Sequence, residues 1–154
     1  MTPLPHRYDV GLFAGTDPVY ARLTGVGLPE IRVAAPSDFD GPGDAWSPEH
    51  LLVAAVQTCF LLTLRGVARA SKISIVSVDV DAAGTVDRQD GVTKFTEIVL
   101  RPRVVVAAGT DRERLRRILE KSEKGCLVAA SLATPVRLEP EISEVEQPMA
   151  LPSR

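Results

Sequence analysis

The chain has 154 residues, of which 45% are hydrophobic and 25% charged, and its formal net charge at pH 7 is −2. These values are typical of a globular protein of one domain that buries its core without disulfide bonds. The small negative net charge gives no electrostatic reason to expect nucleic acid or an anionic membrane as a partner. Charged residues interrupt the long apolar stretches, which argues against a membrane-spanning helix. We therefore predict neither nucleic acid nor membrane as a partner.

The first 46 residues are short apolar runs separated by glycine and proline, which predicts a meander of short strands over 9–14, 19–24 and 30–34. Residues 36–45 are rich in turn-forming residues and should form a loop. No continuous apolar segment near the N-terminus marks a signal peptide, so we expect a cytoplasmic, reducing location.

A long helix is predicted to begin after this loop. Ser47 can cap it, Pro48 suits the first helical position and Glu49 complements the helix dipole. The helix should run to about Ala70. Because residues 51–64 are apolar on nearly every face, we expect it to be a buried helix at the centre of the domain or of a dimer.

Two long antiparallel strands are expected over 72–86 and 93–106, joined by a charged hairpin turn over 87–91. Pro102 within the second strand suggests an edge strand or a bulge.

A second, amphipathic helix is predicted over 112–124, capped by Thr110 or Asp111 and ended by Gly125. A short helical segment over 126–132 and a last strand over 136–142 should follow. The order of strands and helices predicts an α+β fold.

Cys59 and Cys126 are the two cysteines of the chain. Cys59 lies in the apolar helix, where a cysteine is most often a small buried hydrophobic residue. Cys126 opens a short helix, where backbone amides would lower the pKa of its thiol. In a reducing compartment a cysteine pair indicates redox or metal chemistry rather than a structural disulfide.

The redox interpretation requires the two sulfur atoms to lie close together. One thiolate could then attack a peroxide, become a sulfenic acid and condense with the other thiol to a disulfide. Burial would raise the pKa of Cys59, so an active Cys59 should need an arginine or lysine beside it. Metal is not expected, because the two cysteines with His6 and His50 lack the spacing of a zinc site.

His50 could suggest a hydrolase with Cys59 as nucleophile. Nine residues of helix, however, place these two side chains on opposite faces and about 13 Å apart along the axis. Glu49 is about 15 Å from Cys59 along the same axis, so it could serve the thiol site only from a second copy of the helix across a two-fold axis. Alternatively, Glu49 is an exposed residue that complements the helix dipole.

Two segments, SPEHLLVAAVQTCF over 47–60 and EKSEKGC over 120–126, resemble motifs of the OsmC/Ohr family of bacterial thiol peroxidases. The family patterns are [NS]-P-E-x-L-[LF]-x-A-A followed by C-F, and A-x-x-x-C-P. The resemblance covers about residues 33–142, and the spacing of ten residues from Glu49 to Cys59 matches.

This resemblance implies a single OsmC-like domain over 1–154, with N-terminal strands and a loop over 1–46, a core over 47–142 and a frayed tail over 143–154. It also implies an intertwined homodimer in which antiparallel sheet from each chain wraps long central helices.

By the same resemblance the chain is a thiol peroxidase without a prosthetic group, which reduces organic hydroperoxides and, to a varying degree, hydrogen peroxide. Cys59 would be the peroxidatic thiol and Cys126 the resolving thiol, and a small dithiol such as dihydrolipoamide, or another thiol system, would be the reductant. The apolar side chains expected to line the substrate pocket are Trp46, Leu51, Leu52 and Phe60, with the alternative that each is an ordinary core residue.

The family stabilises its thiolate with an arginine of an N-terminal strand, held by the glutamate that matches Glu49. No arginine stands at the matching position, near residues 17–19, so Arg22 is the expected substitute, with Arg7 and Arg32 as alternatives. Leu127 replaces the proline usual after the second cysteine. Two alternatives stay open: a weakly active or inactive OsmC-like binding or stress protein, and a cysteine-dependent acyl transferase or hydrolase.

Overall fold

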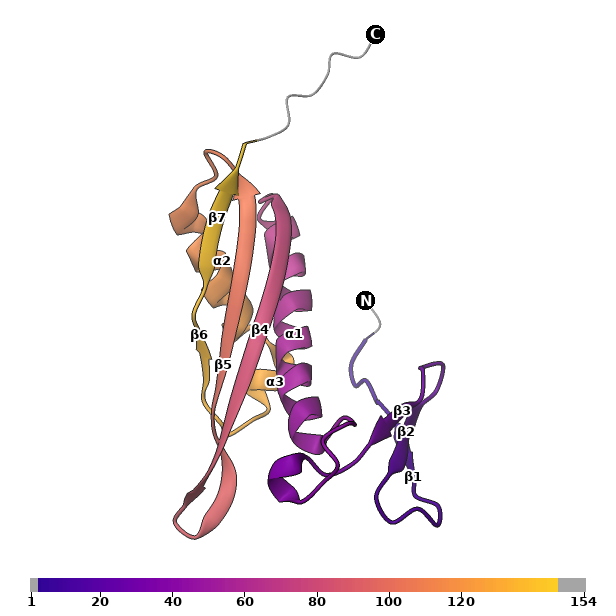
Figure 1. Ribbon diagram of the computed structural model, residues 1–154. Helices are drawn as coiled ribbons and strands as arrows, with labels where there is room; N and C mark the ends of the chain where they lie inside the picture. The colour runs from indigo at the N-terminus through magenta and orange to yellow at the C-terminus, as the bar shows by residue number, and fades with distance from the viewer. Residues whose placement is uncertain (1–2, 147–154) are drawn as a thin grey trace. The chain divides into compact units, whose positions relative to one another are not determined.

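The computed structural model describes residues 3–146, and the chain divides into two compact units, one ending at Leu52 and the other beginning at Val53 (Figure 1). Each unit is described by itself. The expected single domain, with internal limits at 46 and 142, stays a prediction.

The first unit contains a three-stranded antiparallel sheet in the order β1 (Val10–Phe13), β2 (Ala21–Gly25) and β3 (Ile31–Val33). The predicted meander is thus confirmed. The predicted loop contains a single turn of 3-10 helix, Ser37–Phe39. Large apolar side chains of β1 are exposed by 56–75%: Val10, Leu12 and Phe13. This small sheet therefore has apolar surface that its own unit does not cover.

The helix α1 (Pro48–Ala70) begins and ends where the sequence predicts. Ser47 caps it, because the His50 N–H donates to Ser47 Oγ at 3.3 Å. Within the single chain α1 is not buried all round, so it is not the fully buried centre of the domain; the alternative, a helix at the centre of a dimer, stays a prediction. Its buried residues form one stripe, at every fourth position: Val56, Phe60, Leu64 and Ala68. The other faces of the helix are half-buried or exposed.

By length and a mean hydropathy of 1.8, α1 also meets the criteria for a membrane-spanning helix, contrary to the expectation from the sequence. Its buried stripe, however, belongs to the hydrophobic core that the helix shares with the sheet. The Gln57 side-chain amide also donates to the Val80 carbonyl of that sheet. We therefore interpret α1 as a core helix.

The second unit is built on a long hairpin, β4 (Ile75–Gln89) and β5 (Val92–Ala107). The turn is shorter than predicted. It consists of Asp90 and Gly91, both with positive φ, as an Asp-Gly hairpin turn requires. The expected last strand is in fact two, β6 (Val136–Leu138) and β7 (Glu141–Val145), each parallel to β5.

Two further sequence predictions are corrected by this sheet. Residues 143–145, expected in the frayed tail, lie in β7, whereas 147–154 lie outside the described residues. Pro102 occupies neither an edge strand nor a bulge. It is buried in the central strand β5, opposite Val80, at the point where the pairing of β5 passes from β6 to β7. No ladder partner there needs the N–H group that proline lacks.

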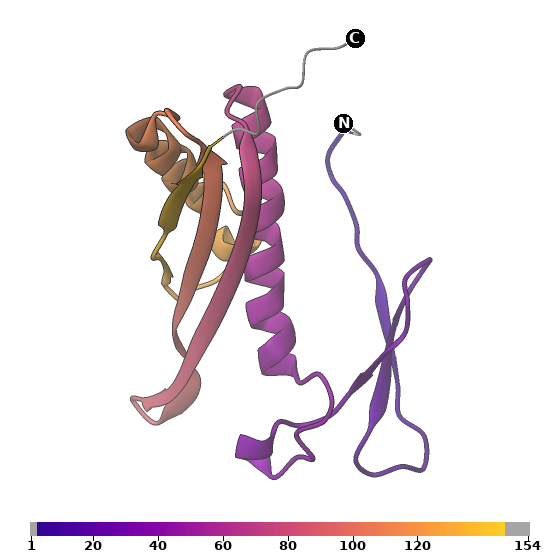
Figure 2. The same cartoon turned by 45° about the horizontal axis from the view of Figure 1, so that its top comes forward.

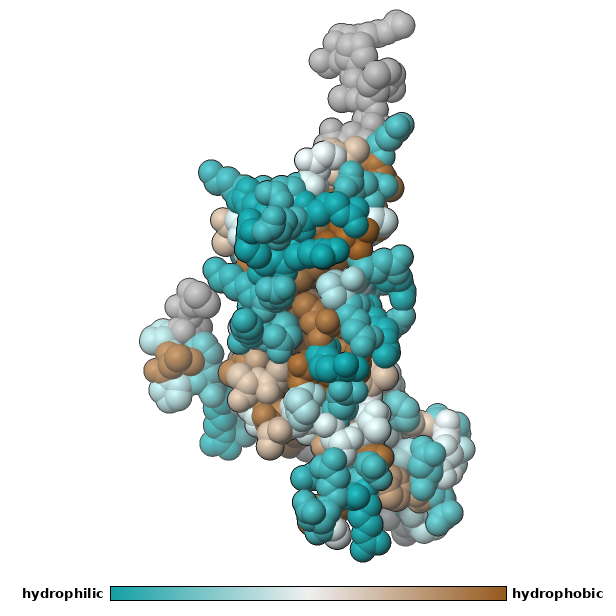
Figure 3. Space-filling model, turned by 90° about the vertical axis from the view of Figure 1, so that its left-hand side faces the viewer, coloured by the Kyte–Doolittle hydropathy of each residue, from teal (hydrophilic) through white to brown (hydrophobic). Residues whose placement is uncertain are grey.

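One face of this sheet is covered by helices (Figures 1 and 2). The helix α2 (Arg112–Lys124) is capped by Asp111, whose carboxylate accepts a hydrogen bond from the Arg114 N–H at 2.9 Å. The short helix α3 (Leu127–Ala130) follows α2. The side of the molecule on which α2 lies is largely hydrophilic in Figure 3. The core comprises the α1 stripe with Ile98, Leu100, Val104, Val106, Leu115, Ile118, Leu119 and Ile142. The predicted α+β class is confirmed.

Candidate active site

Cys126 lies between α2 and α3, in a connection that packs against α1. It caps α3, because the Ala129 N–H donates to its Sγ at 3.5 Å, and its own thiol lies 3.9 Å from the Val56 carbonyl of α1. At the preceding residue, Gly125, a Cβ atom would lie 3.5 Å from Cγ2 of Thr63. The connection therefore faces α1 between Val56 and Thr63, the turns on either side of Cys59.

The structure brings the free thiols of Cys59 and Cys126 close enough for each to influence the pKa of the other. Cys126 is 1% exposed, whereas Cys59 is half-buried. A disulfide within the chain thus needs no long-range rearrangement. The more accessible sulfur is the one on the long helix.

The pKa of Cys59 is lowered from its usual value, although burial by itself raises it. The opposing groups are hydrogen-bond donors: the Val128 backbone N–H first, then the Cys126 thiol, the Thr63 hydroxyl and the Leu127 backbone N–H. Donors directed at a thiolate favour the charged form. Each of these donors is neutral, so they lower the pKa of Cys59 without the cation that the sequence led us to expect.

The pKa of Cys126 moves in the opposite direction. Burial raises it, the Ala129 N–H partly offsets this, and the neighbouring Cys59 raises it further. The expectation that helix geometry would lower the pKa of Cys126 is therefore wrong. The amides that open α3 also lower the pKa of Cys59, so Cys59 is the thiol of the pair that ionises first.

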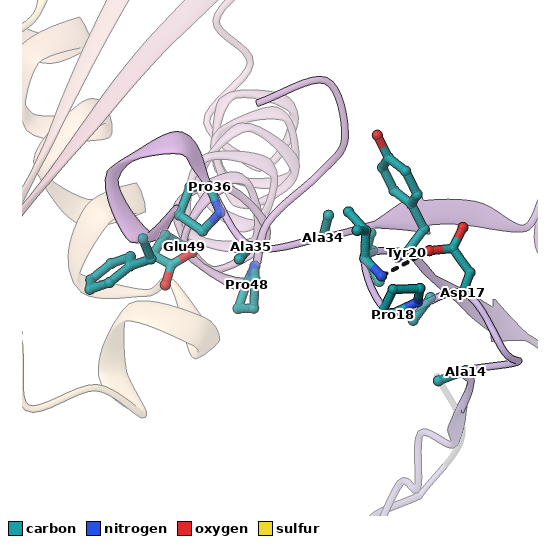
Figure 4. Close-up of a pocket in the computed structure, with 13 residues that line it drawn as sticks. Ala14, Asp17, Pro18, Tyr20, Ala34, Ala35, Pro36, Pro48 and Glu49 are labelled. Atoms are coloured by element: carbon teal, nitrogen blue, oxygen red, sulfur yellow. Dashed lines mark hydrogen bonds between the residues drawn. The ribbon is translucent and has the colours of Figure 1, made fainter. Parts of the chain in front are cut away.

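Glu49 lies in the first unit, where it lines a pocket of about 360 Å³ (Figure 4). Its Oε2 atom is buried and has no hydrogen-bond partner among residues 3–146. The pocket lining is mainly apolar and includes Asp17 and Tyr20 but no arginine. A buried carboxylate oxygen without a donor is costly, so a donor from outside the chain would stabilise it.

The three candidate arginines have other partners in the first unit. Arg22 pairs with Glu30 at 3.6 Å and lies 4.8 Å from the centre of the Phe13 ring. The alternatives, Arg7 and Arg32, pair with Asp9 at 2.8 Å and with Asp44 at 3.0 Å respectively. The role of Arg22 as thiolate-stabilising cation stays a prediction, as does that of Glu49.

His50 is an exposed residue of the first helical turn. Its Nδ1 lies 2.8 Å from Ser47 Oγ, and its ring meets Trp46 edge-on with centroids 6.4 Å apart. Phe60 is fully buried in the core, so it does not line a substrate pocket as expected. Within residues 3–146 no three histidine, cysteine or acidic side chains are grouped to hold a metal.

Reasoning from the sequence missed the donors around Cys59. Thr63 could have been found, because it lies four residues after Cys59 and so on the same face of α1. The Leu127 and Val128 amides carry no signal of their own in the sequence, since every residue except proline has such a group.

Comparison with known proteins identifies the family of the chain and its relatives. A family model described as OsmC-like protein matches residues 41–141. The uncharacterized protein YmaD of Bacillus subtilis (strain 168) is 27% identical over 114 residues, which cover 72% of this chain and 76% of the relative.

Solved structures show the same fold. An OsmC-like protein of unknown function from Vibrio cholerae superposes with a TM-score of 0.81 at 20% identity, covering 88% of this chain and 99% of that one. An organic hydroperoxide resistance protein OsmC from Legionella pneumophila gives a TM-score of 0.71 at 20% identity, with 92% and 99% covered. The matched family model spans most of the chain, and the chain belongs to the OsmC-like protein family.

Proposed function

We propose that this protein is a cytoplasmic, thiol-dependent peroxidase that reduces organic hydroperoxides and, more slowly, hydrogen peroxide. The observation that carries the proposal is the Cys59–Cys126 pair, in which the pKa of the accessible thiol is lowered and that of the buried thiol is raised. A peroxidatic cysteine reacts as an accessible thiolate and needs a second thiol nearby to resolve its sulfenic acid. The similar structure described as an organic hydroperoxide resistance protein supports the substrate class.

The reaction follows from the pair without a prosthetic group. The Cys59 thiolate attacks the distal oxygen of ROOH, the O–O bond breaks, and the departing alkoxide takes a proton to become ROH. Cys59 is then a sulfenic acid. The Cys126 thiol attacks its sulfur, water leaves, and a Cys59–Cys126 disulfide forms. A small dithiol restores both thiols by two exchange steps and becomes a disulfide itself.

The proposal includes a homodimer, supported by surface that the single chain leaves uncovered. On α1 only one stripe is buried, and Leu62 on another face is 59% exposed. The apolar residues of β1 are exposed as well. A second copy would bury these faces across a two-fold axis, and it would also supply Glu49, with Arg22 as its cation, to the partner's thiol pair.

A thiol titration tests the peroxidase. The reduced protein receives one equivalent of cumene hydroperoxide, and free thiols are counted before and after. We expect the loss of two thiols per chain in the wild type and of none in Cys59→Ser. Undiminished thiols in the wild type would refute the proposal.

A second candidate function is non-enzymatic binding on the same fold, with little or no catalysis. It is favoured by one observation, the Glu49 pocket that contains a carboxylate but no arginine. Two results together would support this candidate. The wild-type protein would keep both thiols in the presence of peroxide, and a small cationic ligand such as guanidinium or an alkylamine would raise its thermal stability.

A further inference from the structure

A groove lies beside the C-terminal end of α1, along the start of β4. Its volume is about 570 Å³, within the ~300–1,000 Å³ that is typical of small-molecule sites. Both elements belong to the second unit, and Figures 1 and 2 show the last turns of α1 beside β4. The polar side chains of the lining are Arg65, Arg69 and Ser77. The rest of the lining is apolar: Ala68, Ile73, Ile75, Val76 and Val78.

The turn that ends α1 forms one end of this groove, and its backbone completes the helix without help from an arginine side chain. Lys72 has a left-handed backbone conformation, with φ 54°. The Lys72 N–H donates to the Arg69 carbonyl at 3.1 Å, and the Ile73 N–H donates to the Ala68 carbonyl at 3.0 Å. These two bonds form a Schellman motif, which satisfies carbonyls at a helix end. The guanidinium groups of Arg65 and Arg69 are therefore not needed as caps.

Arg65 and Arg69 leave two positive charges at the groove without a counter-charge. They stand four residues apart on α1, a spacing at which like charges repel each other. Neither side chain has a hydrogen-bond or ion-pair partner within residues 3–146. No acidic residue occurs from 50 to 78, and Lys72 adds a further positive charge. The helix dipole favours cations at this end of α1, but it does not neutralise them, and a bound anion would.

The strand side of the groove departs from regular pairing. Among the described strands β4 pairs with β5 alone, so it is an edge strand. The register shifts between Ile75 and Ser77, which makes Val76 the extra residue of a bulge. In a regular strand neighbouring side chains point to opposite faces, whereas these three neighbours all line the groove. The bulge thus adds apolar surface, since Val76 is 58% exposed, and a hydroxyl group.

We propose that this groove binds an aliphatic carboxylate, an anion with an apolar chain of medium length such as octanoate. Arg65 and Arg69 would donate to the carboxylate, because the guanidinium fork matches its two oxygens. The chain would lie against Ile73 and Val76 and remove their apolar surface from water. The apolar walls favour this ligand over a small inorganic anion. The proposal goes beyond the proposed function, because neither thiol takes part in it.

Isothermal titration calorimetry of the reduced full-length protein with octanoate tests the site. We expect saturable binding of one octanoate per chain. Acetate has the charged head without the chain, and 1-octanol has the chain without the charge, so each should bind roughly tenfold more weakly or worse. The double variant Arg65→Gln/Arg69→Gln should lose affinity for octanoate by a similar factor, because it lacks both charge-assisted hydrogen bonds.

The double variant Arg88→Gln/Arg116→Gln is the matched control. It removes the same charge from two exposed side chains that also lack a partner within the described residues, and we expect it to bind octanoate like the wild type. Equal affinities of the two double variants would overturn the proposal, because binding would then follow net charge or apolar surface elsewhere. Binding of 1-octanol as tight as that of octanoate would overturn it as well.

A second copy of the chain is the competing occupant of the groove. Sedimentation velocity should give the same oligomeric state for the wild type, with and without octanoate, and for Arg65→Gln/Arg69→Gln. An oligomer that octanoate or this variant dissociates would assign the groove to a second copy and overturn the proposal. In ¹⁵N-labelled wild-type protein, octanoate should shift the amide resonances of 73–78 and not those of the exposed apolar strand β1. Shifts in β1 alone would also contradict the proposal.

Discussion

Gly84 allows α1 to pack closely against the long hairpin, and its replacement tests that packing. A Cβ atom at Gly84 would lie 2.6 Å from Cε1 of Phe95 and 2.7 Å from Cγ2 of Val53. Carbon atoms in contact are about 3.5–4.0 Å apart, so Gly84→Ala must displace the aromatic ring on β5 or the helix residue on α1. Overpacking of this kind costs about 1–3 kcal/mol, and we expect the free energy of unfolding to fall by that amount.

Urea denaturation followed by circular dichroism, at one fixed protein concentration, measures this loss. Val53→Ala removes one of the obstructing atoms, so the double variant should be more stable than the sum of the two single effects by about 1 kcal/mol. Gly66→Ala is the matched control, because a Cβ there meets nothing within 4 Å among residues 3–146 and should cost no stability. A Gly84→Ala protein with an unchanged free energy of unfolding would refute the reasoning, and so would a double variant whose loss of stability equals the sum of the two single losses.

Three further predictions concern the thiols and a helix end. Because the pKa of Cys59 is lowered, the rate at which peroxide oxidises Cys59 should be constant above that pKa and should fall only as the pH drops through it. Stopped-flow kinetics measure this pH profile. A rate that still rises near pH 8.5, about the pKa of an ordinary thiol, would contradict the prediction. Cys126→Ser should accumulate a sulfenic acid on Cys59 that dimedone traps, and equal trapping in the wild type would argue against Cys126 as resolving thiol. Asp111→Ala removes the carboxylate that accepts the Arg114 N–H and should lower the free energy of unfolding by about 1 kcal/mol. Asp111→Asn should retain most of the stability that the cap contributes, because asparagine is also a good capping residue. Thermal denaturation compares the two variants.

The limits of α1 and α2 were predictable because local chemistry decides them. Ser47 and Asp111 can satisfy the free amides of a helix start, and Gly125 follows the last turn of α2. The Asp90-Gly91 turn likewise determines the hairpin. These signals depend on a few adjacent residues, and tertiary structure did not override them.

Features that depend on distant partners could not be predicted. Pro102 appeared to exclude a central strand, but β6 and β7 leave the position beside it unpaired. The proximity of Cys59 and Cys126 was a hypothesis that the packing of the 125–127 connection supports. Their relative pKa values were predicted in the wrong order, because which sulfur receives the amides of α3 depends on how that connection meets α1.

Glu49 illustrates the same limit. Its place in the first helical turn was evident from the sequence Ser47-Pro48-Glu49. The burial of its Oε2 atom and the pocket around it depend on residues 14–39. The choice of Arg22 rested on counting along the sequence. In the folded first unit that side chain pairs with Glu30, and its role at the thiol pair stays a prediction.

The central claim is that peroxide oxidises Cys59 and that Cys126 then forms a disulfide with it. Peptide mapping of the protein after a single turnover tests this claim most directly. The reduced wild type receives one equivalent of an organic hydroperoxide and is then digested without reductant and analysed by mass spectrometry. The account predicts one dominant cross-link, between the Cys59 and Cys126 peptides of the same chain, and its reversal by a small dithiol. Irreversible sulfinic acid on Cys59 beside an intact Cys126 thiol, or cross-links between chains alone, would contradict it.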